Sequence, residues 1–521
     1  MAEVSLANDI EKSETTAKKR QIYDVNTEDS SDSLNAGAIH EKDLIKRGGF
    51  IGKFHAVALK YRMEARGIER VPEDERFDKS VYSPAYFWWA VNMVLSPVSI
   101  GALGVSAYGL SFWDSALTIF FFTILGTIPA AFYSTFGPEF GLRQMHLSRF
   151  WFGHNFTKVF GFFQTIACVG WSALNTIFAA EMLHSVNGGA LPAWTAMLII
   201  ALATTILTLF GYRTVHMYEK YAWIPAFVIF FIIIARLKLS GAFTAGVLST
   251  GKAEVGGVLS FGATLFGSAT GWGAYGADFC VYQKKDANKT KLFWSVLFAI
   301  AFPLIFTGIL GAACMTATLA NPAFEQQYND NGIGGLIYGI LVTDSLHGFG
   351  QFCVVLLALS TIACNCANIY SIAFSIQIVS HHFTKIPRII LTFIGICAFF
   401  GISMGAYYDF ETYMENFMNL IGYWLAIYEA ISLPEHFFFR RGLKGYVVDD
   451  VNRKERLPPG WASMIAFCCG VAGIVVGMNQ IWWVGPLAKL TLADLGFELA
   501  FGFTLVAYAV ARPIEYHYYK R

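Results

Sequence analysis

The segment Trp88-Trp89-Ala90-Val91-Asn92-Met93-Val94-Leu95-Ser96-Pro97-Val98-Ser99 places a proline inside a long apolar run. Proline removes a backbone donor, and its ring clashes with the preceding helical turn. A second apolar run contains Gly267-Ser268-Ala269-Thr270-Gly271-Trp272-Gly273-Ala274-Tyr275-Gly276, where each glycine weakens a helix. These two stretches therefore predict helices that are interrupted near their middle.

The composition around both stretches is that of a chain largely in contact with lipid. Of 521 residues, 55% are apolar and 14% are charged, and the mean hydropathy is +0.48. Soluble chains carry about 25% charged residues. A membrane span needs about 20 mostly apolar residues, because the hydrocarbon core is about 30 Å thick. We therefore expect an all-α polytopic membrane protein with twelve spans, at 85–109, 115–136, 160–184, 191–211, 217–237, 257–280, 292–316, 350–380, 387–406, 409–432, 461–479 and 487–511.

Basic residues are distributed unevenly over the connections between these spans. Seventeen Lys and Arg fall on the side of the N-terminus, against three on the opposite side, Arg236, Lys238 and Lys252. Basic residues are enriched in cytoplasmic loops, so both termini are predicted to be cytoplasmic. The sequons that begin at Asn155 and Asn288 then lie in cytoplasmic connections and are expected to carry no glycan. The net charge of +1 gives no electrostatic footprint for nucleic acid.

The two interrupted spans are the first and the sixth, which is the relation expected for two inverted repeats around a midplane site. Free backbone groups at membrane depth are tolerated only where they are buried in protein or line a wet cavity. The alternative is that Pro97 only kinks one helix and the glycines only allow close helix packing. The pairing of the breaks favours the repeats. The predicted domains are a largely disordered tail (1–83), a transporter domain (84–511) with repeats at 85–237 and 257–432 and two extra helices within 461–511, and a C-terminus (512–521).

Because of the repeats, the third and eighth spans are expected to face one site. Trp171 and Asn175 are four residues apart, and Asn365 and Asn368 are three apart, so each pair shares a helix face. Carboxamides both donate and accept hydrogen bonds and so suit the edge of a planar heterocycle. Trp171 and Trp272 can stack on its two faces, each contributing about 1–3 kcal/mol by analogy with bases on aromatic side chains. The alternative assigns the tryptophans to packing and the asparagines to interhelical hydrogen bonds.

Charged residues at membrane depth bear on the solute and on coupling. No Lys or Arg falls in the middle of a predicted span, which favours a neutral solute. Carboxylates at depth are functional candidates, and they occur at Glu181, Asp278, Glu429 and Glu498. Hydroxyls of the kind that complete a cation site occur in the eighth span. The predicted coupling-cation residues are Ser360, Thr361, Glu181 and Asp278.

Two other function classes make different demands on the sequence. An enzyme would need a nucleophile with its base or a metal cluster, and no such pattern occurs, so no enzymatic activity, cofactor or metal is predicted. The nine cysteines lie almost all within apolar runs and are interpreted as small buried residues. A nutrient receptor that binds a solute without transporting it stays open as an alternative.

Five motifs lie along roughly residues 60–445. They are Gly67-Ile68-Glu69-Arg70-Val71-Pro72, Gly141-Leu142-Arg143-Gln144-Met145 with Ser148-Arg149, Trp171-x3-Asn175, Gly271-Trp272-Gly273-Ala274-Tyr275-Gly276-Ala277-Asp278, and the Asn-rich stretch of the eighth span. Together they resemble the nucleobase-cation symporters, specifically the fungal purine-cytosine permease branch. The resemblance implies a five-plus-five inverted repeat of the LeuT type with two extra helices, a plasma-membrane location, and proton-coupled import of cytosine and purines by alternating access.

The resemblance also implies roles for individual residues. Trp171 and Trp272 would sandwich the base, Asn175 and Asn368 would bind its edge, and Ser96 would join them. The full predicted substrate site is Ser96, Trp171, Asn175, Gly271, Trp272, Asn365 and Asn368.

The eighth span departs from the branch at two positions. Cys364 and Ala367 stand where its members usually have Asn and Pro. Sister proteins take vitamin B6 or other heterocycles, so transport of such a compound is the alternative function. The expected partners are the solute, the lipid bilayer and, for the N-terminal tail, cytoplasmic trafficking machinery.

Overall fold

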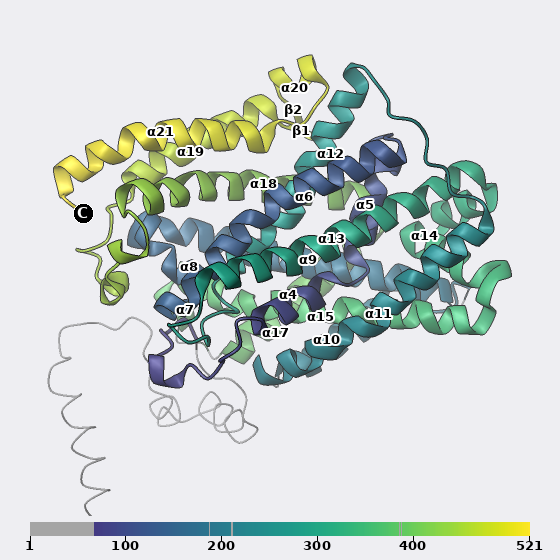
Figure 1. Cartoon of the computed structure of the whole chain (residues 1–521), viewed down its shortest axis with the longest axis horizontal. Coiled ribbons are helices and arrows are strands. Elements are labelled where there is room, and N and C mark those ends of the chain that lie inside the picture. The colour runs from purple at the N-terminus through teal and green to yellow at the C-terminus, as the bar shows by residue number, and fades with distance from the viewer. Residues whose placement is uncertain (1–66, 187, 210–211, 385, 387) are drawn as a thin grey trace, which may run out of the picture.

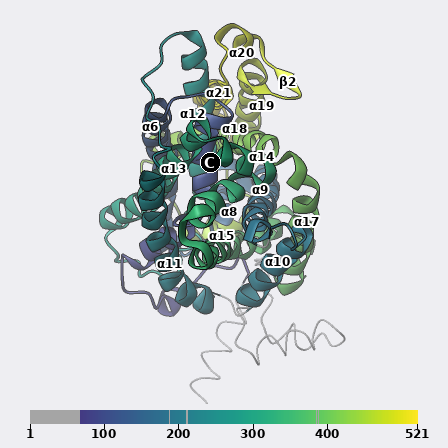
Figure 2. The same ribbon diagram turned by 90° about the vertical axis from the view of Figure 1, so that its right-hand side faces the viewer.

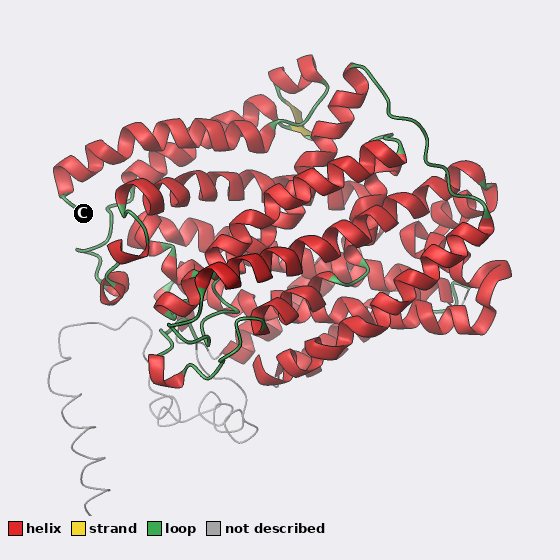
Figure 3. Cartoon of the chain, viewed as in Figure 1, coloured by secondary structure: helices red, strands yellow, loops and turns green. Residues whose placement is uncertain are grey.

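The computed structural model describes residues 67–186, 188–209, 212–384, 386 and 388–521, and Figure 1 shows them as a bundle of helices. Most of the predicted disordered tail therefore lies outside the described residues. Within the described part, helix dominates, and the one small sheet pairs β1 (Asn479–Gln480) antiparallel with β2 (Trp483–Val484) (Figure 3). The first described residues and the C-terminus lie at the same end of the bundle, at the left in Figure 1.

The first predicted span is broken, as its sequence indicates. It consists of α4 (Ser83–Asn92) and α5 (Ser96–Ser106), which meet at an angle of 49°. Pro97 lies in the first turn of α5, where its missing N–H has no helical acceptor to lose. The break therefore falls immediately before the proline rather than at it.

The sixth predicted span is broken too. Its regular part, α12 (Lys252–Thr270), gives way to a 3₁₀ segment, η2 (Gly271–Tyr275), followed by turns. Glycines at 271, 273 and 276 account for this change, because they disfavour a continuing α-helix. Both predicted breaks are thus confirmed.

The centre of the bundle is a pair of long helices. α9 (Arg149–Val186), which contains the third predicted span, packs along α15 (His347–Val379), which contains the eighth. Their facing surfaces are almost wholly buried. The two spans that were expected to face one site therefore pack against each other.

The remaining helices surround this pair, and Figure 2 shows them end-on. α13 packs against α5 and α6, α12 against α6 and α18, and the hairpin of α19 and α21 against α18. The bounds are η1 (Glu73–Glu75), α6 (Phe112–Ser134), α7 (Phe136–Phe140), α8 (Gln144–Leu147), α10 (Ala193–Leu209), α11 (Tyr212–Ser240), α13 (Lys289–Ala320), α14 (Pro322–Leu341), η3 (Val342–Leu346), α16 (His381–Thr384), α17 (Arg388–Ala406), η4 (Tyr407–Asp409), α18 (Phe410–Pro434), η5 (Glu435–Phe439), η6 (Leu443–Gly445), η7 (Val448–Asn452), α19 (Trp461–Gly477), α20 (Pro486–Thr491) and α21 (Gly496–Tyr519).

Each of the twelve predicted ranges overlaps a described helix or broken pair. By length and composition, seven helical stretches of the described chain can cross a membrane, and the bent pair α4–α5 makes eight. One of the seven, Arg388–Phe439, contains two predicted spans, α17 and α18, while α10 and α19 are shorter apolar helices. The multi-pass character is therefore clear, and the exact number of crossings stays a prediction.

The last predicted span and the segment before the eighth differ from expectation. The range 487–511 contains two helices, α20 and α21, because Leu492 adopts a left-handed conformation (φ 59°). The connection before α15 is itself helical, as α14, although its sequence is too polar to predict a span.

Apolar side chains on the outer helices face outward. Phe121 on α6, Val228 and Phe231 on α11, and Phe298 on α13 are each more than half exposed. Large apolar surfaces exposed to water are unfavourable, so these faces fit contact with lipid.

The described N-terminal residues 67–82, here called the strap, cross one end of the bundle. Val71 N–H donates to Gly141 O at 2.9 Å, and Asp78 N–H donates to Tyr282 O at 3.0 Å. Arg76 Nη1 donates to Pro138 O at 2.6 Å. The strap thus ties the α7–α8 connection to the segment that follows η2.

Candidate functional site

Two indole rings face each other where α9 meets η2. Trp171 and Trp272 are nearly parallel, with an interplanar angle of 16° and ring centroids 6.5 Å apart. Directly packed aromatic pairs have centroids about 4.5–7 Å apart, so this pair is at the wide end of that range. Both side chains are more than nine-tenths buried. Trp171 and Trp272 thus present nearly parallel faces to each other, and this pair of faces is here called the slot.

The first break holds the second tryptophan in place. Trp272 Nε1–H donates to Asn92 Oδ1 at 2.8 Å, and Asn92 is the last residue of α4. Asn92 Nδ2 in turn donates to Trp88 O at 2.8 Å, and the Trp88 ring meets Trp272 edge-on at 5.3 Å. The two broken spans are therefore joined at the site. An asparagine at the end of an interrupted helix is the only sequence signal that could have identified Asn92.

Gly271 allows the slot to be narrow. A Cβ atom at this position would lie 3.3 Å from Trp171 Nε1, closer than ordinary van der Waals contact. The glycine therefore leaves room beside the indole, and its place in the substrate site stays a prediction.

Asn175 presents an amide at the edge of this region. Ser96 Oγ, at the start of α5, donates to Asn175 Oδ1 in a short hydrogen bond. Asn175 Nδ2 is buried and has no partner among the described residues. An unsatisfied buried donor costs about 1–3 kcal/mol, so this N–H is available to a solute acceptor. Ser96, Trp171, Asn175, Gly271 and Trp272 are thus brought together.

The two asparagines of α15 take different positions. Asn368 Oδ1 accepts from Tyr275 OH at 2.8 Å, and the Tyr275 ring lies 5.4 Å from that of Trp272. Asn368 therefore reaches the slot through Tyr275. Asn365 Nδ2 donates to Thr176 Oγ1 at 3.2 Å, so it contacts the residue next to Asn175, and its Oδ1 has no partner in the described chain.

Gln164 and Tyr275 extend this polar group, and neither was predicted. Gln164 Nε2 donates to Cys168 Sγ at 3.5 Å, and the Cys168 thiol contacts Tyr275 OH at 3.4 Å. Gln164 Oε1 is buried without a partner among the described residues. The spacing of Gln164, Cys168 and Trp171 on one face of α9 is the signal that could have identified Gln164.

The predicted cation-coupling residues do not form one site. Ser360 Oγ donates to Leu357 O at 2.6 Å, and Thr361 Oγ1 donates to Ala358 O at 2.9 Å, both within α15.

Asp278 and Glu181 lie at opposite ends of α9. Asp278 accepts from Gln144 N–H at 2.7 Å and from Ser371 Oγ at 3.4 Å, and Gln144 precedes the start of α9. Glu181 lies five residues before the end of α9. Asp278 is therefore fixed by hydrogen bonds near the strap, away from Glu181.

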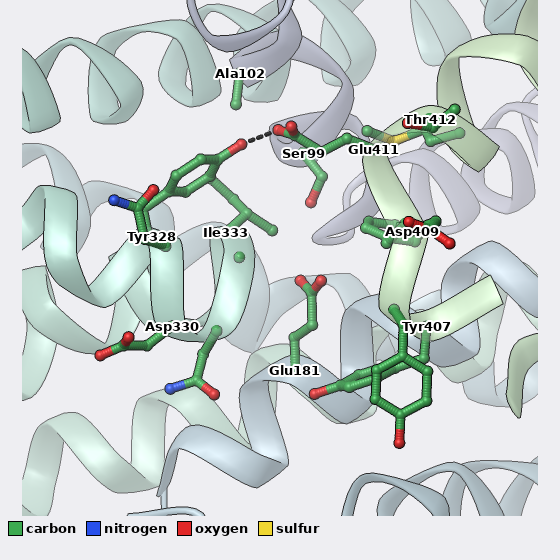
Figure 4. Close-up of a pocket in the computed structure, with 16 residues that line it drawn as sticks. Ser99, Ala102, Glu181, Tyr328, Asp330, Ile333, Tyr407, Asp409, Glu411 and Thr412 are labelled. Carbon is green, nitrogen blue, oxygen red and sulfur yellow. Dashed lines mark hydrogen bonds between the residues drawn. The ribbon is translucent and has the colours of Figure 1, made fainter. Parts of the chain in front are cut away.

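A cavity of about 460 Å³ opens at the end of the bundle away from the C-terminus. In Figure 4 the Glu181 carboxylate points into it between Ile333 and Tyr407. Tyr328 OH and Ser106 Oγ both donate to the Glu411 carboxylate, the latter at 3.1 Å. The lining residues are Ser99, Ala102, Glu181, Tyr328, Asn329, Asp330, Asn331, Gly332, Ile333, Tyr407, Tyr408, Asp409, Phe410, Glu411, Thr412 and Met414.

Comparison with known protein families gives one match over most of the chain. A family model described as permease for cytosine/purines, uracil, thiamine, allantoin matches residues 70–498.

Several curated proteins are similar in sequence. The purine-cytosine permease fcyB of Emericella nidulans is 44% identical over 494 residues, covering 94% of this chain and 96% of that protein. The purine-cytosine permease FCY2 of Saccharomyces cerevisiae is 46% identical, with 90% and 89% covered. The vitamin B6 transporter TPN1 of the same yeast is 29% identical, with 87% of each chain covered.

Solved structures share the fold. Mhp1, a nucleobase-cation-symport-1 family transporter in a closed conformation with bromovinylhydantoin bound, superposes with a TM-score of 0.67 at 15% identity, covering 87% of this chain and 95% of that chain. The inward-facing conformation of Mhp1 gives a TM-score of 0.62. At this identity the likeness concerns the fold alone.

Proposed function

Because the chain belongs to the family of permeases for cytosine/purines, uracil, thiamine and allantoin, we propose that it imports cytosine and purine nucleobases across the plasma membrane. The match identifies a secondary transporter rather than an enzyme. The observation that supports the substrate class best is the slot between the parallel indoles of Trp171 and Trp272. A flat aromatic ring is the kind of solute that two parallel indoles stack upon.

Each site residue then has a role. The base lies between Trp171 and Trp272, and Asn175 Nδ2 donates to a ring nitrogen or carbonyl of the base. Ser96 fixes the orientation of the Asn175 amide through its hydrogen bond. Asn368 and Tyr275 bind a second edge, since each can donate or accept. Asn365 supports this arrangement from the α9–α15 interface.

Transport proceeds by alternating access and by symport, with the proton as the proposed coupling cation. The cavity at one end of the bundle and the strap across the other fit a state that is open to one side only. With both termini cytoplasmic, the cavity faces outward. The N-terminal tail is then placed to meet cytoplasmic trafficking machinery.

A transporter of vitamin B6 is the second candidate. It is favoured by the similarity to the vitamin B6 transporter and by Cys364, which departs from the usual purine-cytosine permease residue in α15. Cys364 Sγ lies 4.0 Å from Asn368 Nδ2, so this departure adjoins an edge-binding residue.

Uptake of radiolabelled cytosine, adenine, hypoxanthine and pyridoxine, in a host that lacks its own permeases, tests the proposal. We expect uptake of cytosine and purines that a protonophore abolishes. Pyridoxine uptake alone would establish the second candidate, and binding without uptake would indicate a receptor.

A further inference from the structure

The outward cavity contains carboxylates and no basic side chain. Glu181, Asp330, Asp409 and Glu411 line it, and none of its lining residues is Lys, Arg or His. An acidic surface of this kind attracts cations from solution. The acidic surface alone does not show which of its four carboxylates binds a cation.

Glu181 differs from the other three in its surroundings. Its side chain is 5% exposed, its carboxylate points into the cavity (Figure 4), and Oε2 has no partner among the described residues. Gly334 packs directly on the backbone of Glu181, since a Cβ at Gly334 would lie 2.7 Å from Glu181 C. A buried carboxylate oxygen that is left unsatisfied is costly, which favours binding of a proton or another cation there.

A break in α14 shapes this position. Asn331 (φ −142°) and Gly332 (φ 59°) leave the helical conformation, so α14 changes direction where it passes Glu181. A Cβ at Gly332 would lie 2.7 Å from Glu181 Oε1. The glycine therefore serves both the backbone conformation and the space for the carboxylate.

Glu181 lies near the substrate slot along the same helix. Glu181 follows Asn175 by six residues on α9, which is about 9 Å along the helix axis. Ser99 lines the same cavity as Glu181 and follows Ser96 by three residues on α5. Ser96 donates to Asn175, so the two helices that carry Ser99 and Glu181 also meet at this amide.

The other candidate carboxylates do not line this cavity. Asp278 accepts from Gln144 and Ser371, and the carboxylate of Glu429 accepts from Thr270 Oγ1. Glu498 Oε2 is also buried without a partner among the described residues, but the Glu498 side chain is only partly buried and lies outside the cavity lining.

We propose that Glu181 takes up the coupling proton from the outside; this proposal rests on the proposed function. A proton from external water binds the Glu181 carboxylate, which becomes neutral, and leaves to water on the inner side after the transporter has reoriented. The titratable groups that face Glu181 are Asp330 and Tyr328 from α14, and Tyr407, Tyr408, Asp409 and Glu411 from η4 and α18; α5 contributes the Ser99 hydroxyl.

Proteoliposomes with the full-length protein and radiolabelled cytosine provide the test, with Asp409→Asn as the matched control in the same cavity. With a gradient of one pH unit, one coupled proton supports about tenfold accumulation. We expect this for the wild type and for Asp409→Asn. Glu181→Gln is expected to exchange cytosine at the wild-type rate without accumulating it, and Glu181→Asp, which keeps the carboxylate, to accumulate it.

The outcomes separate the two proposals. Wild-type uptake that ignores the gradient would refute proton symport itself. Wild-type coupling that persists in Glu181→Gln, or is lost in Glu429→Gln instead, would refute only the assignment to Glu181. Loss of exchange in both Glu181 variants, with protein incorporated normally, would also refute it, since Glu181 would then serve the solute or the fold.

Discussion

At the scale of single residues, the site depends on hydrogen bonds that hold two indoles parallel. Trp272 is fixed by Asn92 and Asn175 by Ser96, so two of the groups expected to touch the solute are positioned by residues of the first broken span. This arrangement separates residues that contact the solute from residues that orient those contacts.

Substitution of Trp272 should therefore reduce uptake more than substitution of Asn92, which supports it. Trp272→Ala removes one stacking face, worth about 1–3 kcal/mol, and is expected to abolish measurable uptake. Asn92→Ala removes one hydrogen bond, worth about 1 kcal/mol, and is expected to raise KM roughly fivefold. Uptake kinetics at matched surface expression measure both. Trp113→Ala, on the lipid-exposed face of α6, is the control. Normal uptake by Trp272→Ala would disprove the proposed slot.

A second prediction concerns pH and a histidine beside the strap. His146 in α8 is buried and lies beside Arg149. Burial disfavours the charged imidazole and the positive charge of Arg149 repels it, so both lower the pKa of His146 to about 3. Its Nδ1 lies 2.8 Å from Ile68 O, and its Nε2 lies 2.9 Å from Asn452 Oδ1 and 3.1 Å from Arg149 Nη1. Since the pKa in the unfolded chain is about 6.5, the unfolded state binds more protons between pH 6.5 and 3, and stability falls as pH falls through this window.

The thermal unfolding temperature of the purified protein, measured over this pH range, tests the assignment. His146→Gln should be less stable than the wild type near neutral pH and should show a weaker dependence on acid pH. An unchanged pH dependence in this variant would mean that other groups cause the loss.

At the scale of elements, glycines set how closely the helices of the two repeats approach. A Cβ at Gly101 of α5 would overlap the backbone carbonyl of Gly308 in α13, and a Cβ at Gly311 would overlap that of Val98. Small residues at such contacts let helix backbones touch, which is a main source of packing energy within membranes.

Enlarging these glycines should separate α5 from α13. Gly311→Leu is expected to reduce folded protein at the membrane severalfold, because the overlap is with backbone that cannot move aside. Gly502→Leu on α21, where a Cβ meets nothing within 4 Å, is the matched control and should be tolerated. Fluorescence size-exclusion chromatography of the two variants compares them, and equal yields would contradict the role of this contact.

The sequence predicts the two helix breaks well, and it predicts the residues that fold against them poorly. Pro97 and the glycines around Trp272 act through local backbone physics, which is visible in any sequence. Asn92 and Gln164 resemble ordinary polar helix residues until folding places them beside the slot. The kink at Gly332 was missed because its segment is too polar to predict a span, and its importance arises only from contact with Glu181.

At the scale of the whole molecule, one end of the bundle carries the C-terminus and the strap, and the other carries the acidic cavity. The charge asymmetry of the connections predicts that the first end is cytoplasmic. Both sequons, at Asn155 and Asn288, lie on that side.

Neither sequon should therefore acquire a glycan in a eukaryotic host. We expect the mobility of the full-length protein to be unchanged by a glycosidase. Thr343→Asn, which creates a sequon with Ser345 in the connection before the eighth predicted span, should by contrast be modified. A glycosidase-sensitive shift in the unaltered protein would overturn the orientation.

The spacing of the two indoles has a consequence for the shape of the solute. Two van der Waals contacts of about 3.5 Å sum to about 7 Å, slightly more than the 6.5 Å between the ring centroids. Since the centroid distance is the upper limit of the distance between two parallel ring planes, the walls must move apart to admit a flat ring, and a puckered ring requires a larger separation than a flat one. The slot thus selects by the thickness of the ring. It favours a flat aromatic base over its puckered dihydro derivative even when both carry the same polar edge.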